Sequence, residues 1–371
     1  MKTILAISDY YTPAVRGGGA PHALMNMIEW LADDYQFKVI TNDFDLGSTD
    51  KMPSISNGVW SRVGRAQVRY LSSEEQLTSV IHQTDYGMIY LNGLFGVLSI
   101  KTIVARKMKR IPAMPLMIAP HGELYEGALN QKAWKKKIFL GLMKSFGMYK
   151  NVLWHASTAE EANQIMRHLG ASSQNIRIAP ILPAPIEHLP HPTQKQAGDL
   201  KIIFLSRITP KKNLDGALRL LMNITHEVKF DIYGTQEDSD YWALCESLMA
   251  QLPPNIHVRY RGEISAEQIE LFSRYHLFLF PTHGENFGYV IQEALLGGCL
   301  PLISTNTPWR GLAEKRAGWD VTNEAEFIHI IEQAVQMDSA TFSEWSKNAQ
   351  AHGMSVVNDR KRVAQNRDLF R

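Results

Sequence analysis

The stretch Pro281-Thr-His-Gly-Glu-Asn-Phe-Gly-Tyr-Val-Ile-Gln-Glu-Ala-Leu-Leu-Gly-Gly-Cys-Leu-Pro301 decides the fold. The apolar run 277–280 before it and the apolar run 300–303 at its end are typical of buried strands. Between them a glycine-containing turn leads into an amphipathic run at 287–296, which predicts a helix. We therefore expect a strand–loop–helix–strand unit whose loop and helix carry the chemistry.

Two carboxylates, Glu285 and Glu293, lie eight residues apart in this unit. Eight steps along a helix return nearly to the same face, so both acids could line one wall of a cleft at two depths. Gly284 and Gly288 permit close backbone approach, and a helix N-terminus offers N–H groups to a phosphate. The pattern suits a nucleotide sugar, whose phosphates would meet amides and whose hydroxyls would meet acids. The alternative is a capped helix with one exposed Glu near each end.

The wider pattern combines Gly-Glu-x-Phe-Gly, Glu-Ala-Leu and Gly-x-x-Pro-Leu-Ile. It resembles the Glu-x7-Glu signature of the retaining glycosyltransferases of family 4, a group 1 type with the two-domain fold GT-B. The resemblance implies that Glu285 contacts the transferred sugar and that Glu293 holds the ribose hydroxyls. It also implies that the loop around the first acid binds the donor, through Gly284, Asn286, Phe287 and Gly288.

Length and composition place bounds on these interpretations. The chain has 371 residues, of which 45% are hydrophobic and 20% charged, as expected for a globular protein with two domains. The formal net charge of +2 does not indicate a general nucleic-acid partner. The two cysteines, Cys245 and Cys299, have no disulfide or metal-site spacing and are expected in the core.

The first residues, 1–8, are too short an apolar run for a signal peptide and predict a first strand. The apolar region 88–100 is too short to span a bilayer. We expect a cytoplasmic protein, and a peripheral position on the inner face of the plasma membrane stays open.

Strands alternate with helices along both halves of the chain. Apolar runs at 3–8, 37–41, 68–71, 88–91, 116–119 and 152–155 predict strands, with helices between them. This alternation predicts an α/β fold with a doubly wound parallel sheet in each of two Rossmann-like domains, which bind ligands beyond the strands' carboxyl ends. The resemblance implies that the domains face a central cleft and that the C-terminal helix crosses back to the first domain.

Two elements of the first half follow strand ends. The consecutive glycines 17–19 stand well after the first strand, unlike the Gly-x-Gly-x-x-Gly of a dinucleotide site. The resemblance implies that their loop closes over the donor diphosphate or the acceptor, so we include Gly18 and Gly19 in the donor site. His121, in Pro-His-Gly-Glu, resembles the family's His-Gly element, which implies that it reaches the donor sugar.

The segment 131–150 has six lysines and no acid. Trp134, Ile138, Leu142 and Phe146 recur at i, i+4 and predict one apolar helix face. One interpretation is a packed helix with a solvated basic face. The other is a basic amphipathic surface for anionic membrane or a lipid-linked acceptor, which the resemblance favours. The lysines concerned are Lys132, Lys135, Lys136, Lys137 and Lys144.

Prolines between 180 and 192, with Gly198, indicate the boundary between the domains. We expect an acceptor-binding domain at 1–185 with the C-terminal helix 355–371, a linker at 186–199, and a donor-binding domain at 200–354.

The second half opens with a strand at 201–205 followed by Ser206-Arg207 and by Lys211-Lys212-Asn213. Cations at the carboxyl edge of a sheet can neutralise a diphosphate, and arginine does so with a forked pair of hydrogen bonds. Surface salt bridges are the alternative. The stretch resembles the family's Gly/Ser-Arg…Lys-Asn motif, which implies that Arg207 and Lys212 bind the leaving diphosphate. Lys211 competes with Lys212 for this role.

Gly234, after the strand 229–233, and Ile264, after the run 256–260, match family positions around the nucleotide base. The Asp-x-Asp pairs at 43–45 and 238–240 have no third ligand placed beside them. Enzymes with the GT-B fold need no such metal, so we expect no metal and no cofactor apart from the donor.

With these features, the resemblance implies a retaining transferase that moves a hexose or N-acetylhexosamine from a UDP- or GDP-sugar. The acceptor would be a glycan or a lipid-linked molecule in cell-surface polysaccharide biosynthesis, lipopolysaccharide included. The expected catalytic residues are His121, Glu285, Arg207 and Lys212. The alternatives are a GT-B nucleotide-sugar 2-epimerase and a non-catalytic nucleotide-sugar-binding subunit.

Overall fold

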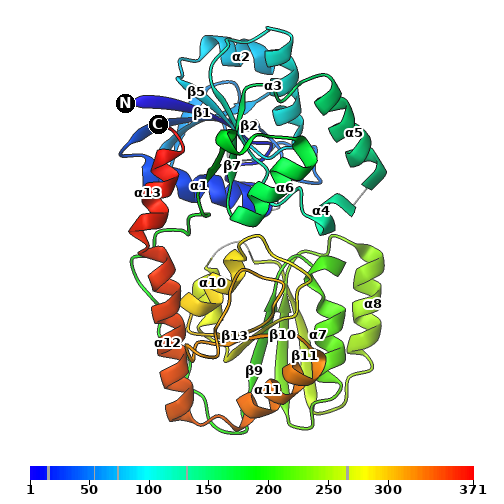
Figure 1. Cartoon of the computed structure of the whole chain (residues 1–371). Coiled ribbons are helices and arrows are strands. Elements are labelled where there is room, and N and C mark those ends of the chain that lie inside the picture. The colour runs from blue at the N-terminus through cyan, green and yellow to red at the C-terminus, as the bar shows by residue number, and fades with distance from the viewer. Residues whose placement is uncertain (15–16, 54, 73–74, 131–132, 265–266) are drawn as a thin grey trace. The chain divides into compact units, whose positions relative to one another are not determined.

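The computed structural model describes residues 1–14, 17–53, 55–72, 75–130, 133–264 and 267–371 (Figure 1). The chain divides into two compact units, unit 1 with residues 1–185 and 359–371, and unit 2 with residues 186–358. Each unit holds one sheet with helices packed on it. Within the described ranges, no helix combines the length and the apolar character needed to cross a bilayer.

Unit 1 is built on an eight-stranded sheet. Its strands are β1 (Lys2–Ile7), β2 (Tyr35–Asn42), β3 (Trp60–Val63), β4 (Ala66–Leu71), β5 (Met88–Asn92), β6 (Leu116–Ala119), β7 (Val152–Ala156) and β8 (Ile176–Ile178). They lie in the order β3-β4-β2-β1-β5-β6-β7-β8, parallel except for the antiparallel pair β3–β4. The central strands β5 and β6 are buried at every position, which explains their continuous apolar sequence.

All helices of unit 1 except α13 lie between successive strands. The helices are α1 (Gly19–Leu31), α2 (Leu77–Gln83), α3 (Val97–Lys107), α4 (Glu126–Asn130), α5 (Ala133–Ser145), α6 (Ala159–Leu169), the 3-10 turn η1 (Ser173–Asn175) and, from the end of the chain, α13 (Arg360–Asp368).

The last helix belongs to unit 1, although its sequence follows unit 2. The ring of Phe370 packs edge-on against Tyr35, Phe37 and Tyr90, at centroid distances of 5.4, 5.9 and 5.7 Å. Lys2 Nζ donates a hydrogen bond of 2.7 Å to the Phe370 carbonyl. The expected return of the C-terminal helix to the first unit is confirmed.

Unit 2 is built on a six-stranded parallel sheet in the order β11-β10-β9-β12-β13-β14. Its strands are β9 (Lys201–Leu205), β10 (Val228–Tyr233), β11 (Ile256–Gly262), β12 (Leu277–Phe280), β13 (Leu300–Ser304) and β14 (Trp319–Val321). Its helices are η2 (Pro210–Lys212), α7 (Leu214–Leu221), α8 (Ser239–Met249), α9 (Gln268–Phe272), α10 (Tyr289–Leu296), α11 (Glu324–Gln336) and α12 (Ser339–Val357). Two parallel-dominated sheets with flanking helices confirm the α/β fold class.

Residues 186–199 form no helix or strand, but they are part of unit 2 and not a separate linker. Thr193 N–H donates to the Ser273 carbonyl at 2.7 Å. The ammonium of Lys195 is buried and donates at 3.1 Å each to the carbonyls of Gln196, Val335 and Met337. Two of these carbonyls lie at the C-terminal end of α11, where helical carbonyls lack partners and a cation is favoured.

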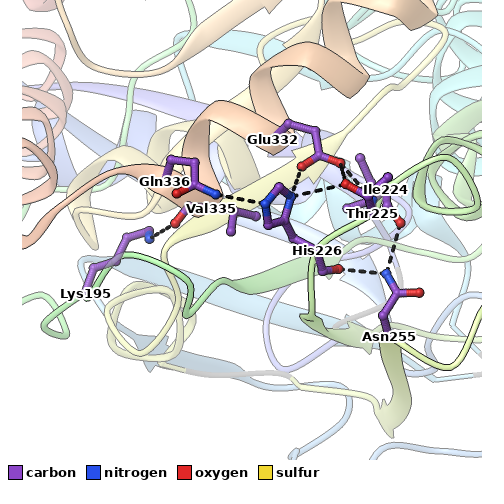
Figure 2. Close-up of polar contacts among 8 residues, drawn as sticks. All are labelled: Lys195, Ile224, Thr225, His226, Asn255, Glu332, Val335 and Gln336. Carbon is purple, nitrogen blue, oxygen red and sulfur yellow. Dashed lines mark hydrogen bonds and ion pairs between the residues drawn. The ribbon is translucent and has the colours of Figure 1, made fainter.

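A polar network surrounds the same end of α11 (Figure 2). Gln336 Nε2 donates to His226 Nε2 at 2.8 Å, and His226 Nδ1 contacts a carboxylate oxygen of Glu332. Because a carboxamide nitrogen only donates, the His226 proton sits on Nδ1 and points at Glu332. Asn255 Nδ2 donates to the carbonyls of Ile224 and His226 at 2.9 and 2.8 Å. These contacts tie α11 to the segment that enters β10.

We expect Lys195→Met to lower the free energy of unfolding by about 1–3 kcal/mol, because the Met337 carbonyl loses its donor and the Val335 carbonyl keeps only the N–H of Gly198. Urea denaturation measures this loss. Lys347→Met, at an exposed position of α12, is the matched control and should stay within about 0.5 kcal/mol of the wild type. Equal unfolding curves for the two variants would contradict a role for Lys195 in anchoring residues 186–199.

Candidate functional site

The sheet of unit 2 reverses its winding at one place. From β9 the chain proceeds outward through β10 to β11, and it then returns to β12 on the other side of β9 and proceeds to β14. In open α/β sheets, ligands bind in the crevice beyond the carboxyl ends of the strands at such a switch point. The loops that follow β9 and β12 hold residues 206–213 and 281–288. Sheet topology therefore brings the two principal sequence motifs together.

An ion pair joins these two loops. Lys212 Nζ lies 2.5 Å from Glu285 Oε1, and each side chain is only 12% exposed. The Thr282 hydroxyl lies 3.2 Å from the same carboxylate oxygen, and the lysine ammonium stands 5.6 Å from the centre of the Phe280 ring. Partial burial strengthens this attraction relative to a surface pair. Two predicted catalytic residues are thus in direct contact.

Two hydrogen bonds to backbone carbonyls hold the two loops together. His283 N–H donates to the Lys211 carbonyl at 2.9 Å, and Asn213 Nδ2 donates to the Pro281 carbonyl at 2.8 Å. Asn213 also caps α7 by accepting from Gly216 N–H at 3.2 Å. The sequence alone indicated no role for Asn213 or Thr282. An asparagine directly before an amphipathic run is a cap signal that could have indicated the first.

The start of α10 differs from the expectation. The helix begins at Tyr289 and not at Phe287, with Gly288 as its N-cap at φ +78°. Glu285 therefore lies in the loop, and helical periodicity does not place it on one face with Glu293. Its position comes from its own N–H, which donates to the Asn306 carbonyl at 3.1 Å beyond the end of β13.

Arg207 follows the end of β9 and stays accessible. Its side chain is 42% exposed and forms an ion pair with Glu237 at 3.2 Å. An exposed pair of this kind is weak, so an arriving diphosphate can compete for the guanidinium. Gly234 supports this segment from β10: a Cβ there would stand 1.7 Å from the Ser206 carbonyl oxygen, and its φ is +146°. Only glycine fits this position.

Lys211 and Lys212 differ in exposure and in ion pairing. Lys211 is exposed as a whole residue, but neighbouring groups partly desolvate its ammonium, which lowers its pKa, while Glu285 raises that pKa. Lys212 and Arg207 lower the same pKa because they are nearby cations. Both lysines therefore belong to one charge cluster, and the carboxylate partner of Lys212 distinguishes it from Lys211.

Glu293 lies on α10, between positions buried in the core. Burial raises the pKa of its carboxyl to about 7. Its carboxyl has no hydrogen-bond partner among the residues that the structure describes. A carboxyl of this kind can bind a pair of hydroxyls, such as those of a ribose.

The other residues expected at the donor site surround the same loops. Gly284 N–H donates to the Thr282 hydroxyl at 3.3 Å, so this amide is used within the loop. The Phe287 carbonyl accepts from Trp309 Nε1 at 2.7 Å. Asn286 precedes it in the loop, and Ile264 follows β11, next to residues 265–266, which lie outside the described ranges.

Unit 1 has a switch point of its own between β1 and β5. The described part of the loop after β1 ends in Gly18, at φ +74°, and Gly19, which starts α1; residues 15–16 of that loop lie outside the described ranges. Asn92, at the end of β5, donates from Nδ2 to the Ala20 carbonyl at 3.0 Å and to Ser8 Oγ at 3.1 Å.

His121 completes this second cluster. Its Nε2 lies 2.6 Å from Asn92 Oδ1, so the ring donates there and Nδ1 remains an acceptor. Burial, with a smaller effect of His155, lowers the pKa of His121 to about 3, which keeps the ring neutral. Asn92 is thus the residue that links His121 to the start of α1, a role that its place at a strand end did not reveal.

The Asp-x-Asp pairs have local structural roles. Asp238 caps α8 by accepting from Tyr241 N–H at 3.0 Å, and an Asp43 carboxylate oxygen accepts from Asn57 Nδ2. Among the described residues, no group of three His, Cys, Asp or Glu side chains is placed to hold a metal ion.

One family model matches a segment of the second unit. Residues 186–352 match the family model described as "Glycosyl transferases group 1". The match covers less than half of the chain. The matched range falls within unit 2 and includes the Lys212–Glu285 pair, Arg207 and Glu293.

One relative resembles the chain in sequence. A segment of 112 residues is 30% identical to the GtfA subunit of UDP-N-acetylglucosamine–peptide N-acetylglucosaminyltransferase from Streptococcus pneumoniae. The match covers 29% of this chain and only 21% of that protein.

Two solved structures resemble the whole chain. Anabaena HepE in complex with UDP and glucose superposes with a TM-score of 0.70 at 15% identity, covering 100% of this chain and 98% of that one. Sucrose-phosphate synthase from Thermosynechococcus elongatus gives a TM-score of 0.74 at 17% identity, with 100% and 98% coverage. These likenesses establish the fold as GT-B.

We expect Glu293→Gln to change how stability depends on pH. The carboxyl pKa in the folded protein is about 7, above its ordinary 4.5, so ionisation costs stability as pH rises through this window. Above the window the variant should be more stable than the wild type, by at most about 3 kcal/mol. Below it the two should be equal. Melting temperatures measured across pH check this, and two parallel curves would contradict it.

We expect Lys212→Met to weaken donor binding more than Lys211→Met. The first substitution leaves Glu285 without its cation at a mostly buried position, which costs about 2–5 kcal/mol at similar sites. The second removes an exposed charge from the same cluster. Calorimetric titration with a nucleoside diphosphate compares them directly, and a larger loss for Lys211→Met would assign the diphosphate to that lysine instead.

Proposed function

We propose that this protein is a retaining glycosyltransferase of family 4 that uses a nucleoside-diphosphate sugar as its donor. The observation that carries the proposal is the Lys212–Glu285 pair at the switch point of unit 2, with Arg207 beside it and the unpartnered carboxyl of Glu293 on α10. A nucleotide sugar requires cations to bind its diphosphate and a carboxyl to bind its hydroxyls, and this site has both.

The charges of the cluster fit a diphosphate. Three cations, Arg207, Lys211 and Lys212, stand against the carboxylates of Glu237 and Glu285. One positive charge is therefore left over before the donor binds. As the bond to the sugar breaks, negative charge grows on the leaving diphosphate, and fixed cations stabilise that charge without reorganising.

The remaining residues would hold the sugar and the nucleoside. In the proposed complex Glu285 accepts from hydroxyls of the transferred sugar and Glu293 binds the ribose hydroxyls. Gly234 and Ile264 would border the base, and neutral His121 would offer Nδ1 to a sugar hydroxyl. Gly18, Gly19, Gly284, Asn286, Phe287 and Gly288 would supply close backbone approach to the donor. The acceptor would attack from the face that the diphosphate leaves, so no protein nucleophile is required and configuration is retained.

We expect the donor to be a UDP-sugar, and a GDP-sugar is the alternative. HepE was solved with UDP and glucose, and the GtfA relative is named for UDP-N-acetylglucosamine. We propose transfer of a hexose or N-acetylhexosamine, without a metal, to a glycan or lipid-linked acceptor in cell-surface polysaccharide synthesis, lipopolysaccharide included. The family resemblance supports this role. An enzyme with this role would act in the cytoplasm, at the inner face of the plasma membrane.

We expect one class of nucleotide sugar to raise the melting temperature, because a ligand that binds only the folded state stabilises it. A panel of UDP-, GDP- and ADP-sugars, each with and without Mg2+, measures this. The shift should be independent of Mg2+ and lost in Glu293→Ala. No shift with any donor would overturn the donor-site assignment.

Arg207→Ala should lower donor turnover by about 100- to 1,000-fold while the fold stays intact. Arg219→Ala is the matched control, because Arg219 is an exposed arginine of α7 with its own ion pair to Asp215. Assays with and without a glycan acceptor separate the alternatives: a 2-epimerase would turn over the donor alone, and a non-catalytic subunit would bind it without turnover.

A further inference from the structure

Helix α5 carries an apolar stripe that faces away from its own unit. Trp134, Ile138 and Leu142 are 65%, 54% and 53% exposed, and Phe146, one residue beyond the helix, is 66% exposed. The helix packs on the core of unit 1 through Leu140 and Met143 instead. The interpretation of the stripe as a packed face is therefore wrong. A contiguous group of exposed apolar side chains usually marks a surface that binds a membrane, a ligand or another protein.

Lysines lie beside the stripe. At 100° per residue, Lys137 and Lys144 lie about 60–80° to one side of Trp134. Lys135, about 100° to the other side, lies within the arc that the stripe covers. All three lysines are exposed. Lys136 points inward: its Nζ donates to the Ala128 carbonyl at 2.7 Å and stands 5.1 Å from the Phe95 ring centre. Lys132 lies outside the described residues.

The end of α3 extends this surface. Lys107 Nζ lies 3.5 Å from where a Cβ on Gly147 would stand, and Arg106 donates to the carbonyls of Lys150 and Asn151 at 3.2 Å each. The neighbouring Met108 is 53% exposed. Cations and apolar groups thus continue past the C-terminal end of α5, and the sequence from 131 to 150 contains no acid.

We propose that this surface docks unit 1 on an anionic phospholipid bilayer. We define it as the α5 surface: Trp134, Lys135, Lys137, Ile138, Leu142, Lys144 and Phe146. The helix is about 20 Å long and would lie in the plane of the membrane, with its apolar stripe among the acyl chains and its lysines at the phosphates. Because cations border the stripe and no acid interrupts them, its charge matches a continuous anionic plane better than a mixed protein surface.

Docking in this way would place unit 1 beside acceptors that are anchored in the membrane. The proposal deepens the proposed function, which puts the activity at the inner membrane face, but its evidence comes from residues of unit 1 alone. The α5 surface includes none of the residues that we assign to the donor, so failure of one proposal is distinguishable from failure of the other.

The test is co-sedimentation with phosphatidylcholine vesicles, with and without phosphatidylglycerol. The wild type should bind the mixed vesicles, and salt should weaken the binding because it screens the charges. Lys137→Gln with Lys144→Gln should lower partitioning about 25-fold, about fivefold for each charge removed. Ile138→Gln with Leu142→Gln should lower it by more than about tenfold, because both side chains lose their burial in the interface.

Two matched variants in unit 2 serve as controls. Leu244→Gln replaces another exposed leucine, and Lys347→Gln another exposed lysine. Both should bind vesicles like the wild type, and all variants should keep the wild-type thermal shift with donor.

Equal binding to both vesicle types, no binding to either, or losses in the controls equal to those in the α5 variants would overturn the proposal. So would a wild-type dimer in light scattering that Ile138→Gln with Leu142→Gln converts to a monomer, because a second copy would then cover the stripe. A missing donor shift with intact vesicle binding would count against the donor site and leave the docking surface standing.

Discussion

The contact between Lys212 and Glu285 is the constraint on which the candidate site depends. Its two partners come from loops after β9 and β12, which are neighbours in the sheet although more than 70 residues separate them in the chain. Taking two charges out of water is costly, and the contact is favourable only when geometry and added hydrogen bonds compensate. The hydroxyl of Thr282 and the backbone contact to Asn306 supply that support. The pair therefore depends on the observed strand order, which brings the loops after β9 and β12 together.

In unit 1 the loops at the switch point are also joined by a side chain, but the groups involved are neutral. The loops after β1 and β5 meet at its switch point, and Asn92 joins them through hydrogen bonds to Ser8 and Ala20. The same carboxamide fixes the proton of His121 on Nε2. Each unit thus connects loops through side chains at the reversal of its sheet, by an ion pair in unit 2 and by a neutral carboxamide in unit 1.

The sequence revealed more about the elements than about their contacts. The strands β5, β9 and β12 are apolar runs with turn residues beyond them, so they could be identified from composition alone. Strand order is a tertiary property, and the contact of Lys212 with Glu285 could not be derived without it. The predicted start of α10 was wrong because Gly288 has a left-handed backbone conformation, so the helix begins after it, at Tyr289. The α5 stripe was ambiguous because periodicity defines a face of a helix and does not say what covers it.

The C-terminal segment has a consequence for how the two units are joined. The chain passes between them at 185–186 and again at 358–359. A protease that cuts once near residue 186 would leave a C-terminal fragment that carries α13 and Phe370. That ring is buried among Tyr35, Phe37 and Tyr90 of the other fragment. The two pieces would therefore elute together from a sizing column and separate only in denaturant, so a nicked preparation would pass for an intact one.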